Sequence, residues 1–137
     1  MPHSDINWLA ILVAAIIPMV VGGLWYSNML FAKQWMALMG KTEEEIKKDF
    51  NPARTYGITF VMCIVMAYVM DYFVHYTMSA TFLQGAKIGF ALWLGMAVTT
   101  AYQSVTFQGV KQGLYTMNMG YNLVSMLLMG GVLAVWK

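Results

Sequence analysis

Three long stretches of this chain carry no charged side chain, and they restrict its fold more than any other feature. They cover residues 6–32, 88–110 and 112–136. Each exceeds the ~20 residues that a helix needs to cross a ~30 Å hydrocarbon core. Charged residues make up 10% of the 137 residues, whereas a soluble domain typically contains ~25%. A short chain has too much surface for its volume to be soluble with so little charge, so the sequence predicts an integral membrane protein.

The predicted membrane spans are α-helices, because only a helix or a closed barrel pairs its own amides in hydrocarbon. Asn51 suits a helix cap and Pro52 the first helical position, which marks the start of one span. The first span lacks the basic leading segment of a signal peptide, so we expect it to be retained. We expect a single transmembrane domain over residues 1–137, with spans at residues 6–30, 53–76, 82–107 and 115–136.

The connection at residues 31–52 is the longest between spans. Phe31, Trp35, Leu38 and Met39 form an apolar stripe at helical spacing, which predicts a short amphipathic helix lying in the membrane interface. The segment from Thr42 to Phe50 begins with a capping box and carries Glu–Lys pairs four residues apart, which predicts a short solvated helix. The predicted fold is an all-α integral membrane protein, a four-transmembrane-helix bundle with these two short helices between spans one and two.

The Lys and Arg residues predict how the bundle is oriented. Six of the eight fall on one side of the predicted membrane, at positions 33, 41, 47, 48, 54 and 111, and two on the other, at 87 and 137. The positive-inside rule then places the 31–52 connection in the cytoplasm and both termini outside, in the inner (plasma) membrane. Aromatic rings near span ends commonly lie at the headgroups, which predicts interfacial anchors at Trp25, Tyr26 and Trp35.

Asp71 is the only acidic side chain inside a predicted span, and His75 follows it one helical turn later. Tyr68 and Tyr72 extend a polar and aromatic strip beside them. An ionisable group in a span is energetically expensive and is a functional candidate. Two interpretations stay open. The two residues form a structural hydrogen-bonded pair near the outer headgroups, or they belong to a proton, cation or ligand site.

A metal site has weak support in the sequence. His3 and Asp5 are expected on the same side as Asp71 and His75, and these side chains are of metal-binding types. Their spacing is not diagnostic, so we predict no metal and no cofactor. Cys63 is the only cysteine, which excludes an internal disulfide and a CxxC redox pair.

A second polar group is expected in the cytoplasmic half of the bundle. Thr99 and Gln103 lie four residues apart on span three, and Asn118 and Asn122 do so on span four. These side chains either hydrogen-bond between helices or line a polar pocket or pathway. Gly85 and Gly89 form a GxxxG motif, which is compatible with close helix packing within one chain or between two.

Several short motifs connect the chain with a known family. They are residues 6–10 (INWLA), residues 22–26 (GGLWY), Phe31 with Trp35, and residues 129–131 (MGG) in the Asn-containing last span. With these motifs the chain resembles the small bacterial membrane proteins of domain of unknown function family 1761, over essentially its whole length. The resemblance implies a four-span fold and no activity, substrate or catalytic residue.

Three classes of function fit these features. The first is an oligomeric transporter or channel for a small solute or ion, with Asp71 as the responsive group. The second is a membrane-embedded enzyme or binder of a lipid-like ligand that uses Asp71 and His75. The third is an accessory protein that binds another membrane protein without catalysis. The expected partners are the lipid bilayer, further copies of the chain as a homo-oligomer and a membrane protein, and no nucleic acid. No motif indicates an enzyme class.

Overall fold

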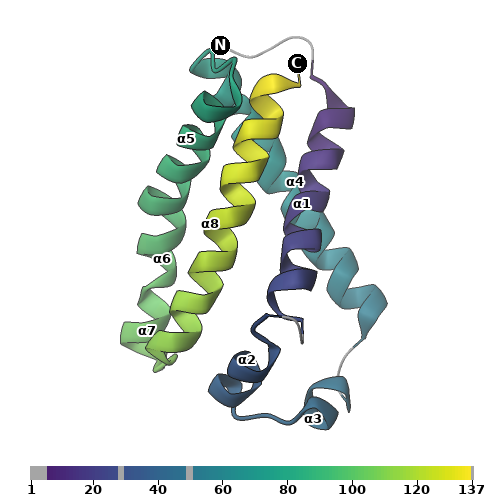
Figure 1. Cartoon of the computed structure of the whole chain (residues 1–137), viewed down its shortest axis with the longest axis vertical. Helices are drawn as coiled ribbons and strands as arrows, with labels where there is room; N and C mark the ends of the chain where they lie inside the picture. The colour runs from purple at the N-terminus through teal and green to yellow at the C-terminus, as the bar shows by residue number, and fades with distance from the viewer. Residues whose placement is uncertain (1–5, 28–29, 49–50, 137) are drawn as a thin grey trace.

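The computed structural model describes residues 6–27, 30–48 and 51–136, and these segments form a bundle of helices (Figure 1). Within these described segments, four helices are long and apolar enough to cross a membrane. They are α1 (Trp8–Trp25), α4 (Pro52–Tyr76), the composite span Phe82–Gln108 and α8 (Gln112–Val135). The described residues contain no strand. The prediction of an all-α four-span bundle is therefore confirmed.

Helix α8 is the central element of the bundle. It packs against α1, α4 and α5, and α1 also packs against α4 (Figure 1). The fully buried side chains include Ile11 of α1, Met70 of α4, and Met129 and Leu133 of α8. These residues place the core in the half of the bundle where α1 begins and α8 ends. In the other half the helices separate, and residues 51–59 at the start of α4 are all exposed.

Glycines bring α5 (Phe82–Leu92) and α8 into backbone contact. A Cβ atom added at Gly85 would collide with the carbonyl oxygen of Gly130, and one added at Gly89 would collide with that of Met126. Only glycine permits this approach, and such contacts are typical of small-residue packing in membranes. The GxxxG motif at Gly85 and Gly89 is thus used within the chain.

Span three is composed of several helical segments. After α5 it continues as a π-helix, η1 (Trp93–Val98), then as α6 (Thr99–Ala101) and α7 (Gln103–Gln108). A π-helical turn inside an α-helix is rare and frequently accompanies a functional site. The sequence does not predict this π-helical turn in the middle of the span.

The connection between the first two spans contains both predicted short helices, α2 (Ala32–Met39) and α3 (Glu43–Lys48). The Trp35 ring of α2 lies 5.4 Å from the Tyr26 ring at the end of α1, which fixes α2 against the bundle. Thr42 accepts a hydrogen bond from the Glu45 amide at 3.2 Å, as the capping box predicts. Residues 49–50 of the predicted solvated helix lie outside the described residues.

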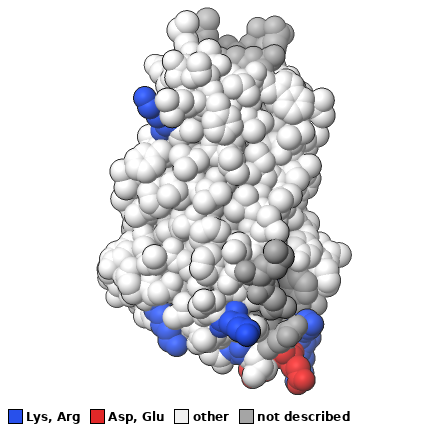
Figure 2. Space-filling model, viewed as in Figure 1, with Lys and Arg blue, Asp and Glu red and all other residues white. Residues whose placement is uncertain are grey.

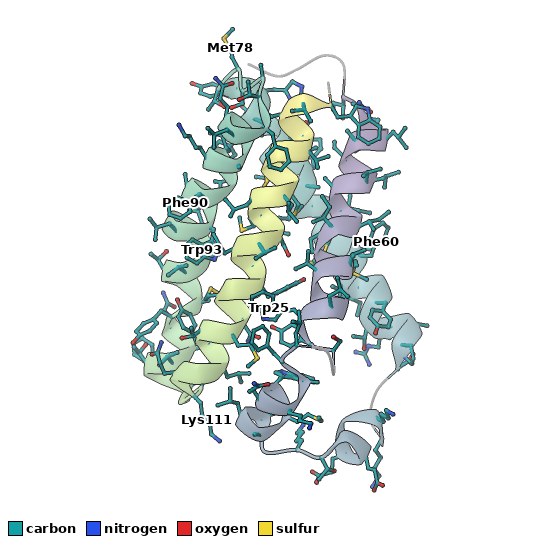
Figure 3. The ribbon with its side chains drawn as sticks, viewed as in Figure 1. Trp25, Phe60, Met78, Phe90, Trp93 and Lys111 are labelled. Atoms are coloured by element: carbon teal, nitrogen blue, oxygen red, sulfur yellow. The ribbon has the colours of Figure 1, made fainter. Side chains whose placement is uncertain are left out.

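Charged side chains gather at one end of the molecule. Figure 2 shows most Lys, Arg, Asp and Glu residues at the end that carries α2 and α3, below a surface that is almost free of charge. Lys111, at the start of α8, lies at that end as well (Figure 3). This distribution matches a bundle whose apolar surface faces lipid and whose charged end faces water.

Candidate functional site

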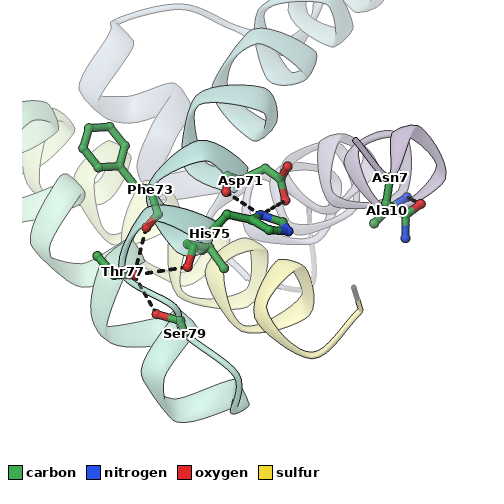
Figure 4. A network of polar contacts seen from close by, with 8 residues as sticks. Asn7, Ala10, Asp71, Phe73, His75, Thr77 and Ser79 are labelled. Carbon is green, nitrogen blue, oxygen red and sulfur yellow. Dashed lines mark hydrogen bonds and ion pairs between the residues drawn. The ribbon is translucent and has the colours of Figure 1, made fainter. Parts of the chain in front are cut away.

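The side chains of Asp71 and His75 lie in contact one helical turn apart on α4. The Asp71 side chain is buried, with a residue exposure of 2%. His75 Nδ1 lies 3.2 Å from Asp71 Oδ1 and 2.9 Å from the Asp71 backbone oxygen (Figure 4). Because a carbonyl oxygen only accepts, Nδ1 carries the proton in this arrangement. The helix therefore holds a carboxylate and an imidazole together inside a span, as their spacing predicts.

The tyrosines near this pair lie on the surface of the bundle. The Tyr68 ring stacks on Trp8 of α1 at 5.8 Å between centroids. The Tyr72 ring stacks on Tyr76 at 6.2 Å. All three tyrosines are exposed. In the bundle these rings therefore cover the outside of α4.

Of the four residues considered as metal ligands, the structure describes only Asp71 and His75. His3 and Asp5 lie outside the described residues. Within the described ranges, no three side chains of His, Cys, Asp or Glu gather in a group that could hold a metal ion.

Asn118 and the predicted anchors connect α1 with α8. The Tyr26 hydroxyl donates to Asn118 Oδ1, and Trp25 Nε1 donates to the Met117 carbonyl at 3.1 Å. Trp25 lies between the two helices in Figure 3. Asn118 thus acts as a hydrogen-bonding contact between helices, and Trp25 and Tyr26 are half-buried in that contact.

Thr99 and Gln103 do not take part in this contact. The Thr99 hydroxyl donates to the Gly95 carbonyl at 2.7 Å, within its own span. Gln103 is exposed near the end of span three. The four polar residues predicted to gather in the cytoplasmic half therefore lie in three different places. Asn118 lies on the side of α1, Thr99 and Gln103 lie on the surface, and Asn122 lies at a groove that is described next.

Asn122 lines a groove that we call the intramembrane groove. It lies between α4, α8 and the part of span three that runs from α5 through η1 to α6. It is open on one side, and its volume is about 840 Å³. Its walls are apolar apart from two side chains, Thr100 and Asn122. The lining residues are Met66, Val69, Met70, Phe73, Ile88, Ala91, Leu92, Gly95, Met96, Ala97, Thr100, Asn122 and Met126.

The two polar side chains of the groove differ in their hydrogen bonds. The Thr100 hydroxyl donates to the Met96 carbonyl one turn earlier. The Asn122 amide makes no hydrogen bond with any described residue, although it is partly buried. Asn118, one turn before it on the same helix, has the Tyr26 hydroxyl as a partner. Asn122 is thus a polar group at membrane depth that faces the groove.

Aromatic residues tie η1 to α8 on the other side of span three. Trp93 Nε1 donates to the Met119 carbonyl at 2.9 Å, and the Tyr115 hydroxyl donates to the Val98 carbonyl at 2.7 Å. Trp93 is directed from its helix toward α8 (Figure 3). These bonds use backbone carbonyls that have no water to bind in a membrane.

Comparison with known proteins gives a family and no activity. A family model described as "Protein of unknown function (DUF1761)" matches residues 9–134. The chain belongs to this family. No curated protein and no solved structure matches it. The DUF1761 description does not mention a membrane, so the membrane character of this chain rests on its four apolar helices.

The groove of this DUF1761 protein was not predicted from the sequence. Met66, Met70, Met96 and Met126 form a large part of its walls. Methionines along a helix do not by themselves indicate a groove, because methionine commonly fills gaps in apolar packing. The one signal in the sequence is Asn122 itself, a polar side chain in the middle of an apolar span.

Proposed function

We propose that this DUF1761 membrane protein binds a small amphipathic molecule inside the bilayer, in the intramembrane groove. The observation that carries the proposal is the Asn122 amide, which faces the groove and has no hydrogen bond with a described residue. An amide without a partner in an apolar medium costs about 1–3 kcal/mol by protein mutational data. Acyl chains of lipids offer it no partner. A bound molecule with a polar group would satisfy Asn122.

The walls of the groove support this function. Its volume of about 840 Å³ lies within the ~300–1,000 Å³ of ordinary small-molecule sites, which are mostly apolar with a few placed polar groups. Methionine side chains are flexible and polarisable, so they adapt to apolar ligands of different shape. The π-helix η1 borders the groove, and such turns are frequent at functional sites.

A photoreactive probe tests this function. The probe is dodecanol with a diazirine on its chain, added to proteoliposomes, and labelling is mapped by mass spectrometry with and without excess dodecanol. We expect saturable labelling of the groove walls on α4 and η1. Gly95→Leu should reduce it at least fivefold, because Gly95 lines the groove and a Cβ there meets no atom within 4 Å.

The matched control is Gly23→Leu. Gly23 also has open space around its Cβ position, but it lies on α1 away from the groove. This variant adds the same side chain to another surface facing lipid, and its labelling should equal that of the wild type. Equal labelling of Gly95→Leu and Gly23→Leu would contradict the proposed function.

A second candidate function is proton- or cation-linked transport through Asp71 and His75. The observation in its favour is the buried carboxylate of Asp71 beside His75 within a membrane span. This pair is not among the groove residues, so the two candidate sites are separate. A transporter of this size would need several copies of the chain to form a pathway.

Proteoliposomes loaded with a pH-sensitive dye test this second candidate. After an imposed pH gradient, the internal pH should relax faster with the wild-type protein than with Asp71→Asn. Tyr72→Phe is a suitable control, because Tyr72 lies on the same helix and its ring is exposed. Identical relaxation in wild type and Asp71→Asn would remove Asp71 from such a role.

Location, orientation and assembly belong to the proposal as well. We place the protein in the plasma membrane with the α2–α3 connection in the cytoplasm and both termini outside, on the basis of the charge distribution. We also expect a homo-oligomer or a complex with another membrane protein. Gly85 and Gly89 are engaged within the chain, so either partner would have to bind another surface.

A further inference from the structure

We infer that the ligand of the intramembrane groove is an uncharged, single-chain amphiphile whose head group both donates and accepts hydrogen bonds. This inference rests on the proposed function and adds the class of molecule. None of the groove residues in the described part of the chain is charged. A charged or zwitterionic head group would therefore lie in apolar surroundings without a counter-ion, which is strongly unfavourable.

The hydrogen-bonding inventory of the groove defines the head group. Asn122 offers both an N–H donor and a carbonyl acceptor. The Thr100 hydroxyl already donates its proton to the Met96 carbonyl, so it can only accept from a ligand. A hydroxyl or a primary amide satisfies both kinds of group. An ester or ketone only accepts and leaves the Asn122 oxygen without a donor, and an alkane leaves the whole amide unsatisfied.

The shape of the groove favours one acyl-like chain over a helix from another protein. On span three its walls run from Ile88 to Thr100, a length of ~18 Å at the rise of a helix. A helix ~10–12 Å across and of that length occupies on the order of 1,400–2,000 Å³, about twice the 840 Å³ of the groove. A single hydrocarbon chain fits, with its head group at Asn122 and Thr100 and its chain directed toward Phe73 and Ile88.

Competition among matched amphiphiles tests this assignment. Wild-type protein in proteoliposomes is labelled with the diazirine dodecanol, and dodecanol, dodecanamide, methyl undecanoate, dodecane or dodecyltrimethylammonium is added at equal mole fraction in the membrane. We expect dodecanol and dodecanamide to compete about fivefold to tenfold better than the other three, which is the effect of one hydrogen bond of about 1 kcal/mol. In Asn122→Leu this preference should vanish while labelling remains.

The variants separate failure of this inference from failure of the proposed function. If dodecane competes as well as dodecanol with the wild type, and Gly95→Leu still reduces labelling at least fivefold, the groove binds apolar molecules and the head-group assignment is overturned. Asn118→Leu is the control for Asn122→Leu, because Asn118 lies one turn away and outside the groove. An equal loss of head-group preference in both variants would also overturn the assignment.

Discussion

The two halves of span three pack against α8 in opposite ways. In the α5 half, Gly85 and Gly89 bring the backbones of α5 and α8 into contact, and a Cβ at either glycine would collide with a backbone carbonyl of α8. In the half that begins with η1, most residues are exposed. The intramembrane groove begins beside Ile88 and Leu92 at the end of α5 and extends along this half. One half is a closed contact between helices, and the other half leaves space for another molecule.

The difference shows how a short membrane protein can combine a stable core with an open site. Where η1 and α8 lie too far apart for backbone contact, side chains must connect the two helices. Trp93 and Tyr115 do so, because each donates a hydrogen bond across the gap between η1 and α8. Thr99 and Thr100 donate to carbonyls within η1 itself. The open half thus keeps its backbone groups paired without close packing.

The largest expected effect is a lower free energy of unfolding in Gly89→Ala, which disrupts the close contact between α5 and α8. Its Cβ would collide with the Met126 carbonyl, so α5 and α8 must move apart. Overpacking of this kind costs about 2–3 kcal/mol. Reversible unfolding in mixed micelles, followed by circular dichroism as the fraction of sodium dodecyl sulfate rises, measures the change in the free energy of unfolding.

The same substitution in the open half is the matched control. Gly95→Ala adds the same methyl group where a Cβ meets no atom within 4 Å. Replacing a helical glycine by alanine generally stabilises by about 0.5–1 kcal/mol. We therefore expect Gly95→Ala to be neutral or more stable than the wild type. A similar loss in both variants would refute the contrast between the two halves.

A smaller effect is expected when a hydrogen bond across the open half is removed. Tyr115→Phe keeps the ring and deletes the hydroxyl that donates to Val98. Interhelical hydrogen bonds in membrane proteins contribute ~0.6 kcal/mol on average and up to ~1.7 kcal/mol. Because Tyr115 is buried, we expect a loss of about 1 kcal/mol in the same unfolding assay.

The control for Tyr115→Phe is Tyr102→Phe. The Tyr102 ring packs edge-on against Tyr115 at 5.1 Å, but its hydroxyl is exposed and its hydrogen bond to Gln112 is long, at 3.3 Å. This variant should stay within about 0.5 kcal/mol of the wild type. If both variants lose the same free energy of unfolding, the loss in Tyr115→Phe does not come from its hydrogen bond to Val98.

The sequence predicted the fold because the signals for it are local. Charge-free stretches, the Asn51 cap and the Thr42 capping box each depend on a few neighbouring residues, and the helices follow from them. The contact between Asp71 and His75 was predictable for the same reason, since it joins residues one turn apart on one helix. The role of that pair in function stays a prediction.

The groove could not be predicted, because it depends on how three helices separate. Met66, Met96 and Met126 meet only through the arrangement of α4, η1 and α8. The π-helix has no sequence signature that we could recognise, and it changes which residues after Trp93 face α8. The predicted polar cluster was likewise divided by geometry, because Asn118 faces Tyr26 of α1 and Asn122 faces the groove.

The smallest expected effect is a difference in the free energy of unfolding between Asn118→Leu and Asn122→Leu, measured in the same assay without ligand. Asn118→Leu removes the acceptor of the Tyr26 hydroxyl and should cost ~0.6 kcal/mol, the average for such bonds in membranes. Asn122→Leu removes an amide that has no hydrogen bond with a described residue, so it should be neutral or slightly stabilising. A side chain that the folded bundle does not need, at a depth where it is costly, is the feature expected of a residue kept for a ligand. Equal destabilisation by both substitutions would instead make Asn122 a structural contact like Asn118, and the groove would lose its polar recognition group.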